Sequence, residues 1–216
     1  TLASMVFVNK GGRFEAVDLP RDAQLAPAFA VNVADFDGDG QEDIFLGQNF
    51  FATRPAMPRL DAGRGLWLQG NGRGSFRAVP GAESGILLYG EQRGAAAGDF
   101  DEDGRLDLAV SQNGAATALF QNVAAKPGLR IRLLGPPGNP AAVGAVMRLL
   151  AANGPGPARE IHVGSGYWSQ DSSVQILGSP VPPEKLWIRW PGGRETTTPI
   201  PSGSRKLVID SDGQSR

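Results

Sequence analysis

Two nine-residue acidic segments with the same spacing lie 64 residues apart and constrain this chain more than any other feature. The first, residues 35–43, is Asp-Phe-Asp-Gly-Asp-Gly-Gln-Glu-Asp, and the second, residues 99–107, is Asp-Phe-Asp-Glu-Asp-Gly-Arg-Leu-Asp. Each has Asp at positions 1, 3, 5 and 9, and Gly at position 6 allows the sharp turn that a side chain would obstruct. Four Asp so close together repel one another unless a cation neutralises them. We therefore predict a calcium loop, made twice, rather than two acidic surface turns.

The spacing also assigns the ligands of both loops. Carboxylates at positions 1, 3, 5 and 9 and the backbone carbonyl of position 7 supply hard oxygen ligands, and water completes six or seven. Leu46 and Val110 stand where an EF-hand has its glutamate, and Mg²⁺ prefers a tighter octahedral shell, so we predict Ca²⁺ sites that are not EF-hands. The predicted ligands are Asp35, Asp37, Asp39, Gln41 and Asp43 in the first loop and Asp99, Asp101, Asp103, Arg105 and Asp107 in the second.

Short strand patterns surround the two loops and repeat with them. Apolar runs follow each loop at 44–46 and 108–110, and the glycine-rich segment 9–14 returns as 71–76. A repeat of about 60 residues with four short strands is typical of a propeller blade. Residues 1–126 then hold about two and a half blades, and segment 50–65 is an excursion from them. Because a closed propeller typically has about four to eight blades, we expect exposed sheet edges.

The sequence changes character at residues 126–128. From there, runs of alternating polarity such as 129–134, 145–150, 160–163, 186–190 and 206–209 are separated by turn residues. This pattern predicts a small antiparallel β-sandwich or barrel in residues 127–216. The whole chain is predicted to be all-β, without a helix of consequence.

Composition narrows the possible partners and compartments. The net charge is −1, and eight of the acidic residues are the loop aspartates, whose charge bound Ca²⁺ would offset. The sequence shows no basic patch of the kind that binds nucleic acid. The chain has no Cys, and no run is long enough to span a membrane. Weak Ca²⁺ loops fill where calcium is abundant, which favours an extracellular, cell-surface or periplasmic location.

The two loops with their strands resemble the FG-GAP or VCBS repeat of integrin α propellers and bacterial surface proteins. Residues after 127 resemble the ASPIC and UnbV domain, which follows such repeats in the cartilage acidic protein family. The matching segments are 128–133, 138–140, 143–145, Gly164-Ser165-Gly166-Tyr167-Trp168-Ser169-Gln170 and Trp190-Pro191-Gly192-Gly193. The resemblance implies a calcium-stabilised adhesion or scaffolding protein, and it supplies no established activity for the C-terminal domain.

Two departures from the family pattern stand out. Relatives commonly continue with Phe-Gly-Leu-Gly where this chain has Gln175-Ile176-Leu177-Gly178. Relatives also usually carry more repeats, so we expect this chain to correspond to the C-terminal portion of a longer protein.

Other candidate residues are weaker. His162 is the only His, and without a Gly-x-Ser-x-Gly turn it does not predict a catalytic triad, so we expect no catalytic residues. Tyr167, Trp168 and Asp171 could form a carbohydrate surface, or the aromatic residues could plug the sandwich. Asn9, Asn71 and Asn122, at equivalent positions of the repeat, are predicted to be turn caps.

The leading hypothesis is a non-enzymatic extracellular calcium-binding β protein that acts as an adhesion, scaffold or self-assembly module. A carbohydrate-binding module and a fragment of a secreted propeller enzyme are the alternatives. Partners would be a protein or glycan at the cell surface, or further copies of the chain. Homo-oligomers or filaments would form by strand addition, with residues 5–8 as the donated strand.

Overall fold

The computed structural model describes residues 2–216, and most of its regular structure is β-strand. Strands make up 43% of the chain and helices 4%, which confirms the predicted all-β class. The two helices are single turns, η1 (Arg21–Gln24) and α1 (Gly81–Ser84). No helix in residues 2–216 is long and apolar enough to cross a membrane.

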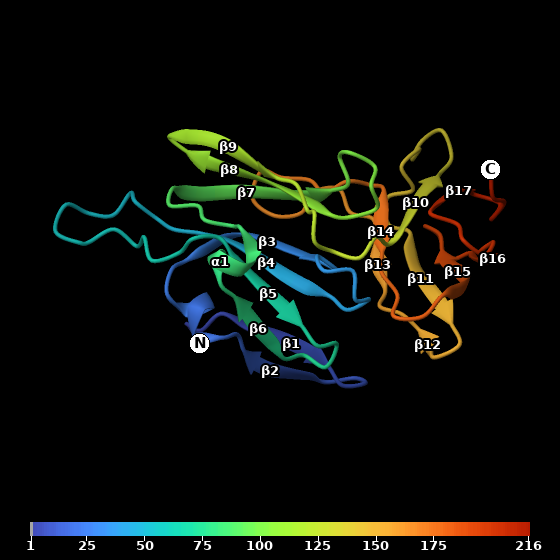
Figure 1. The fold of residues 1–216 in the computed structure, drawn as a ribbon, viewed down its shortest axis with the longest axis horizontal. Coiled ribbons are helices and arrows are strands. Elements are labelled where there is room, and N and C mark those ends of the chain that lie inside the picture. The colour runs from blue at the N-terminus through green and yellow to red at the C-terminus, as the bar shows by residue number, and fades with distance from the viewer. Residues whose placement is uncertain (1) are drawn as a thin grey trace.

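The first 126 residues form three antiparallel sheets of two, four and three strands (Figure 1). The two predicted apolar runs that follow the Asp loops are strands β4 and β8. In chain order the strands are the hairpin β1 (Met5–Asn9) and β2 (Phe14–Asp18), the sheet β3 (Ala28–Ala34), β4 (Asp43–Gln48), β5 (Leu66–Gly70) and β6 (Phe76–Val79), and the sheet β7 (Glu91–Gly98), β8 (Asp107–Asn113) and β9 (Ala115–Phe120).

The four-stranded sheet is covered on both faces. On one face, Ile44 and Leu68 belong to a buried cluster against which Val6 of the hairpin packs. On the other face, Phe45 packs in a second cluster with Leu108 and Val110 of the three-stranded sheet. Every residue of β4 is buried, as expected for a strand with packed neighbours on both sides.

The predicted excursion 50–65 leaves the four-stranded sheet between β4 and β5. Figure 1 shows it as the long cyan loop that extends away from the sheets. A single bridge, between Phe50 and Leu60, closes the loop on itself.

Residues 129–210 form two sheets that face each other. One sheet has the order β14-β10-β17, and the other has the order β12-β11-β15-β16 with β13 also on β11. The strands are β10 (Leu129–Leu134), β11 (Val146–Ala151), β12 (Gly154–Pro155), β13 (Arg159–Glu160), β14 (Gln175–Leu177), β15 (Pro183–Arg189), β16 (Glu195–Pro199) and β17 (Lys206–Asp210).

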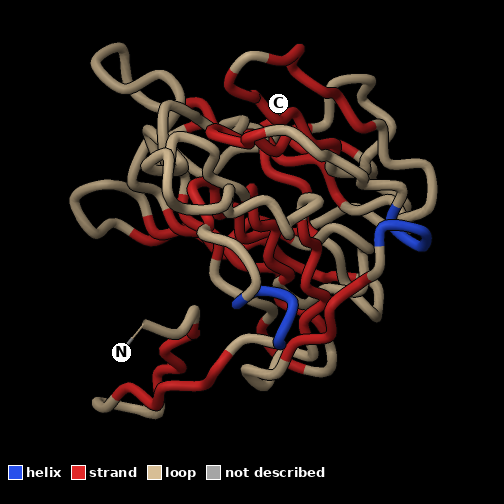
Figure 2. The backbone as a smooth tube through the Cα atoms, turned by 90° about the vertical axis from the view of Figure 1, so that its left-hand side faces the viewer, coloured by secondary structure: helices blue, strands red, loops and turns tan. Residues whose placement is uncertain are grey.

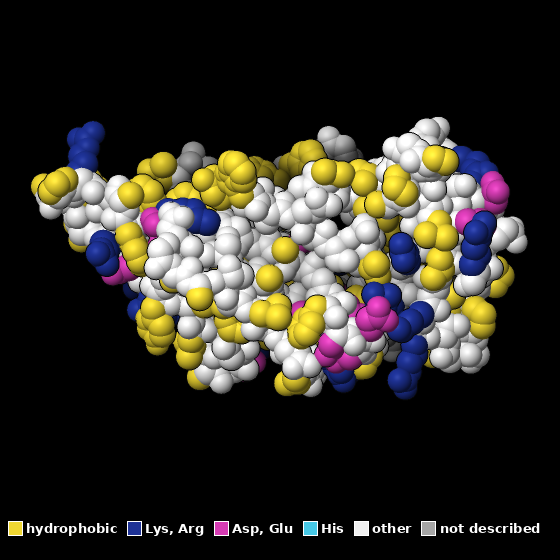
Figure 3. All heavy atoms as spheres, turned by 90° about the horizontal axis from the view of Figure 1, so that it is seen from above, with side chains coloured by type: hydrophobic (Ala, Val, Ile, Leu, Met, Phe, Trp, Pro, Cys, Tyr) yellow, Lys and Arg dark blue, Asp and Glu magenta, His cyan; other side chains and the backbone are white. Residues whose placement is uncertain are grey.

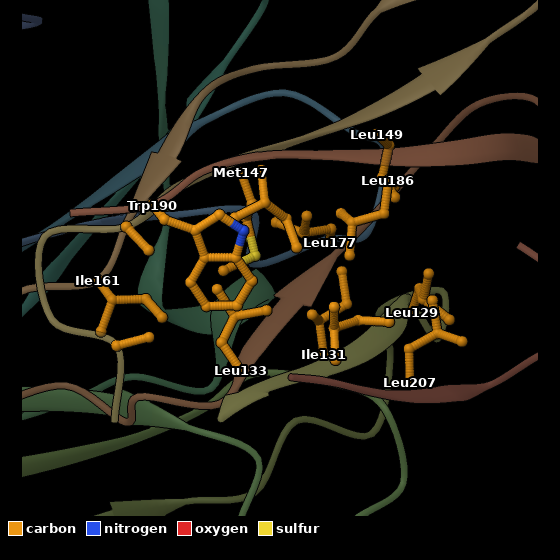
Figure 4. Close-up of a cluster of buried hydrophobic side chains, with 14 residues drawn as sticks. Leu129, Ile131, Leu133, Met147, Leu149, Ile161, Leu177, Leu186, Trp190 and Leu207 are labelled. Carbon is orange, nitrogen blue, oxygen red and sulfur yellow. The ribbon is translucent and has the colours of Figure 1, made fainter. Parts of the chain in front are cut away.

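A buried hydrophobic cluster fills the space between these two sheets. Ile131, Met147 and Leu186 have no exposed surface, and Figure 4 shows the Trp190 ring among Met147, Ile161 and Leu133. The Trp190 indole N–H donates to Thr196 Oγ1 at 2.9 Å, so the buried ring keeps its polar atom satisfied. The arrangement is a sandwich of two sheets.

Two predictions for this region need correction. The sandwich was expected to be antiparallel, but β10 and β17 pair in parallel. The chain reaches β17 from β16 in the opposite sheet, and a crossover of this kind does not impose the antiparallel direction of a hairpin. The strand predicted at 160–163 is limited to Arg159–Glu160, because the chain then leaves the sheet as a long loop.

Candidate metal sites

The first Asp loop is organised by backbone N–H groups that point at its carboxylates. Asp35 Oδ1 accepts from the N–H groups of Gly38 and Asp39 at 2.8 and 3.1 Å, and Asp35 Oδ2 accepts from Gly40 at 2.9 Å. Gly40 has a φ of 87°, which confirms that position 6 needs the left-handed turn that glycine allows. The loop therefore wraps around the Asp35 side chain.

The second loop repeats this pattern at the same offset. Asp99 accepts from the N–H groups of Asp103 and Gly104 at 3.0 and 3.2 Å. Gly104 has a φ of 86°, and Glu102 adopts a left-handed φ of 62° where the first loop has a glycine. The two loops differ in sequence but adopt the same backbone conformation. We infer that the Asp and Gly positions they share determine this conformation.

The last aspartate of each loop is tied to the next strand of its own sheet. Asp43 accepts from the Phe36 and Gly70 N–H groups at 3.0 and 2.7 Å. Asp107 accepts equivalent bonds from Phe100 and Asn122 at 3.0 and 2.8 Å. The Asp43 carboxylate therefore connects its loop to the end of β5, and the Asp107 carboxylate connects its loop to the end of β9.

Carboxylate oxygens converge in both loops. In the first loop the ligand atoms of Asp35, Asp37 and Asp39 lie within 4.8 Å of one another, and in the second those of Asp99, Asp101 and Asp107 do so. Oxygens bound to one Ca²⁺ at 2.3–2.6 Å lie no more than about 5 Å apart, so both groups fit one such ion. Hard carboxylate oxygens are also the donors that Ca²⁺ prefers.

Burial disfavours the charged form of two aspartates in the first loop. Burial raises the pKa of Asp35 to about 6, against the lowering effect of the Gly40 and Gly38 N–H groups, and the charges of Asp37 and Asp39 raise it further. Burial also raises the pKa of Asp43 to about 7, with a contribution from Asp37. A divalent cation among these groups would favour their ionised forms.

Cationic side chains pair with aspartates of the second loop, whereas in the first loop Arg159 pairs with Glu42. Arg105 turns back onto Asp103, and Arg130 of β10 lies 3.3 Å from Asp99 Oδ2 and 3.3 Å from Glu102. The residue equivalent to Arg105 in the first loop is the uncharged Gln41. Two predicted ligands, Asp43 in the first loop and Asp103 in the second, are not among the converging carboxylates.

The C-terminal part of the chain packs directly on both loops. The Lys126 N–H donates to the Asp37 carbonyl at 3.0 Å, and the Gly128 N–H donates to the Gly104 carbonyl at 2.8 Å. Gly178 lies so close to the first loop that an added Cβ would overlap Asp35 Oδ2. The loops are therefore part of the contact between the two halves of the chain.

Two glutamines that were not predicted also contact the loops. Gln69 Nε2 donates to Asp37 Oδ2 at 2.5 Å, and Gln121 Nε2 donates to Asp101 Oδ2 at 2.7 Å. They occupy equivalent places at the ends of β5 and β9, in Leu66-Trp67-Leu68-Gln69 and Ala118-Leu119-Phe120-Gln121. The repeat itself was the signal that could have found them.

The predicted asparagine caps are confirmed. Asn9 Oδ1 accepts from Gly11, and Asn71 Oδ1 accepts from Arg73 and Ser75. Asn122 caps its own turn through Ala124 and Ala125, and its amide donates to the carbonyls of Phe36 and Leu106. It therefore links the first loop to the end of the second.

The three candidate sugar-binding residues lie in different surroundings. Trp168 is 91% exposed and Tyr167 is 50% exposed, with their ring centroids 6.5 Å apart in an edge-on arrangement. Asp171 Oδ1 instead accepts from Asn32 Nδ2 at 2.8 Å and from the Ala97 N–H at 2.7 Å. The aromatic residues do not plug the sandwich, and Asp171 anchors its loop to β3 and β7.

His162 lies on the surface. Its side chain is 59% exposed, and its Nδ1 is 4.0 Å from a carboxylate oxygen of Glu160. His162 follows β13, which ends at Glu160, and so lies outside the strand predicted at 160–163.

A comparison with protein families identifies one part of the chain. Residues 135–216 match the family model described as ASPIC and UnbV, in agreement with the resemblance seen in the sequence. The match begins after β10, although Leu129 and Ile131 of that strand belong to the same buried core. It does not reach residues 1–126, where the FG-GAP or VCBS assignment stays a prediction. A search of curated proteins found no match.

Proposed function

We propose that this chain is a non-enzymatic, extracellular calcium-binding β protein that serves as an adhesion or scaffold module. The observation that carries the proposal is the pair of Asp loops, which close through equivalent hydrogen bonds and bring carboxylates within 4.8 Å of one another. Weak calcium loops are useful where calcium is abundant, which supports the extracellular assignment.

The three N-terminal sheets are, in this proposal, blades of a propeller. Two of them carry an Asp loop between their first two strands, and the four-stranded sheet has one complete set of strands. Face-to-face packing through the clusters around Ile44 and Phe45 supports the assignment.

Calcium would have an architectural role. Asp43 and Asp107 hold the ends of their sheets, and residues 126–128 rest on the loop carbonyls. Ions in the two loops would stabilise both the sheets and the contact with the C-terminal sandwich. A stiff arrangement of two β units is what a scaffold or adhesion protein requires.

The two sites would differ in affinity. Arg105 and Arg130 partly neutralise Asp103 and Asp99, and their positive charges would oppose a divalent cation. In the residues described, no ion pair joins a cation to an aspartate of the first loop, where Arg159 pairs with Glu42 instead, so we propose that this loop binds calcium more tightly.

Calorimetric titration of EGTA-treated protein with Ca²⁺ tests this function. We expect two binding events in the original chain, loss of the tighter one in Asp37→Asn and loss of the weaker one in Asp101→Asn. Asp212→Asn, at a side chain 78% exposed and far from the loops in sequence, is the matched control and should keep both. Absence of any binding at millimolar Ca²⁺ would refute the proposal.

Glycan binding at Tyr167 and Trp168 is a second candidate function. The supporting observation is the exposure of two adjacent aromatic rings, of which Trp168 is almost completely open to solvent. A glycan array with the original chain and with Trp168→Ala tests it. Signals that the substitution removes would support the candidate, and signals that it leaves unchanged would exclude it.

A further inference from the structure

Strand β9 has a free outer edge where its counterpart β5 is covered. Within residues 2–216, β9 pairs only with β8, whereas β5 pairs with β4 on one side and with β6 on the other. The two strands are equivalent in the repeat, since Gln69 and Gln121 at their ends contact equivalent loop aspartates. An unpaired row of backbone N–H and C=O groups readily accepts another strand.

A groove with mainly hydrophobic walls, which also include Asp37 and Glu83, lies beside the end of β9. Its volume is 590 Å³, and its walls include Phe45, Trp67, Ile86, Leu108 and Phe120. Three of these residues, Phe45, Ile86 and Leu108, belong to the buried cluster between the sheet β3–β6 and the sheet β7–β9. The groove therefore continues an existing hydrophobic interface.

In the four-stranded sheet, β6 occupies the position that is equivalent to the free edge of β9. There β6 lies antiparallel to β5, with Ala78 opposite Leu68 and Phe76 opposite Gly70. Phe76 and Ala78 are partly buried and pack against the cluster that contains Leu68. An occupant of the β9 groove therefore needs an aromatic residue and a small apolar residue two positions apart.

The longer Phe-x-Ala-Val pattern of β6 occurs at one other place in the chain. Strand β2 begins Phe14-Glu15-Ala16-Val17, and β6 is Phe76-Arg77-Ala78-Val79. In the part of the chain that the structure describes, β2 pairs only with β1, and its Phe14 side chain is 70% exposed. Figures 1 and 2 show the hairpin at the outside of the molecule, joined to the body on one side. Releasing β2 would break its five-residue pairing with β1 but would uncover little buried side-chain surface, because four of its five residues are already exposed.

Charge also suits this occupant. The segment before Phe14 contains Lys10 and Arg13, and in β6 the equivalent segment lies beside the first Asp loop through Gly72 and Gln41. The corresponding place beside β9 is the second Asp loop, whose residues 99–107 contain five acidic residues and one Arg. Unlike charges would therefore meet at this end.

We propose that β2 of a second copy of this chain pairs with the free edge of β9, with Phe14 and Ala16 in the groove. Reciprocal exchange between two copies gives a closed dimer, and exchange in one direction gives an open chain of molecules. The inference does not depend on calcium binding. It differs from donation of residues 5–8, because β2 is the exchanged strand and β9 is the acceptor.

Cross-linking of single-cysteine variants tests the proposed register. Trp67 faces Val79 across β5 and β6, so Leu119 should face Val17 of the second copy. The chain has no Cys of its own, which makes the readout specific. Val17→Cys mixed with Leu119→Cys should give a disulfide-linked pair on mild oxidation. Val17→Cys mixed with Val163→Cys, where Val163 is an exposed residue of the C-terminal loop, should give several-fold less.

Matched substitutions on the hairpin distinguish strand exchange from non-specific association. Phe14→Glu should reduce the cross-link to the level of the control pair, whereas Phe7→Glu, at an exposed residue of β1, should leave it unchanged. Light scattering of the original chain should show a mass above the monomer that rises with concentration. A monomer at every concentration, or equal cross-linking in both mixtures, would overturn the proposal.

A peptide of residues 13–19 provides a further check. It should compete with cross-linking by occupying the β9 edge. If the peptide binds while the original chain stays monomeric, the groove takes a strand from a different protein, and the proposal of a second copy is wrong.

Discussion

Asp171→Ala should destabilise the protein markedly, because one carboxylate holds three separate elements together. Asp171 Oδ1 accepts from Asn32 Nδ2 on β3 at 2.8 Å and from the Ala97 N–H on β7 at 2.7 Å. Hydrogen bonds to a charged group contribute about 1.5–3 kcal/mol each. Since Asp171 is only half-buried, we take the lower value and expect a loss of about 3 kcal/mol. In a chain of this size that loss lowers Tm by about 6–12 °C.

Urea unfolding followed by circular dichroism measures the change in free energy directly. Asp212→Ala is the matched control, since its side chain is 78% exposed and 3.4 Å from Arg194, and such pairs contribute about 0–1 kcal/mol. Equal unfolding midpoints for the two variants would refute the anchoring role. Loss of glycan binding without loss of stability in Asp171→Ala would instead identify Asp171 as a ligand residue.

Three further predictions concern the second loop, acid stability and the sandwich core. Arg105→Gln should tighten calcium binding at the second loop by freeing Asp103, and Gln41→Arg should weaken the first; calorimetry that shows no change in either would count against the charge argument. Burial raises the pKa of Glu91, but the Phe51 N–H, Asn113 and the Arg93 charge outweigh it and hold this pKa below 4.5. The stability from Glu91 is therefore present above pH 4.5 and lost as pH falls through the folded-state pKa, and Glu91→Gln should flatten that part of a plot of urea midpoint against pH. Met147→Ala should cost about 2–5 kcal/mol in urea unfolding, because the side chain is fully buried, and a loss below 1 kcal/mol would contradict the packing described.

The features that could be predicted from sequence are those set by nearby residues. The Asp and Gly spacing of residues 35–43 and 99–107 determines which N–H groups meet Asp35 and Asp99, so the loops close as expected. The strands after them and the caps at Asn9 and Asn71 depend on short patterns in the same way. Four of the five apolar runs predicted in the sandwich likewise became strands with small changes at their ends, whereas β14 and β16 were not predicted.

The features that could not be predicted depend on residues far apart in the chain. Arg130 contacts Asp99 only because β10 packs beside the second loop, and Asp171 reaches Asn32 across 139 positions. The direction of β17 follows from a crossover between sheets, which no local pattern encodes. Asp171 was grouped with Tyr167 and Trp168 because it is close to them in sequence, yet its carboxylate turns toward the sheets.

Surface patterns were equally hard to predict from composition. Figure 3, a view from above Figure 1, shows hydrophobic side chains spread among other side chains and backbone rather than gathered in one patch. Leu119 and Trp168 are both exposed, but they come from separate parts of the sequence. Only the internal repeat, which aligns β9 with β5, shows that the outer edge of β9 has no neighbouring strand within residues 2–216.

The central claim is that the native fold binds calcium through the Asp loops, and a thermal melt tests it most directly. Ligand at about 100 times its Kd stabilises the native state by about 2.7 kcal/mol. For a chain of this size, that raises Tm by about 5–11 °C. We predict such a rise when excess Ca²⁺ replaces EGTA, and no rise in the double variant Asp37→Asn/Asp101→Asn. Identical melting midpoints of the original chain in EGTA and in excess Ca²⁺ would contradict the account.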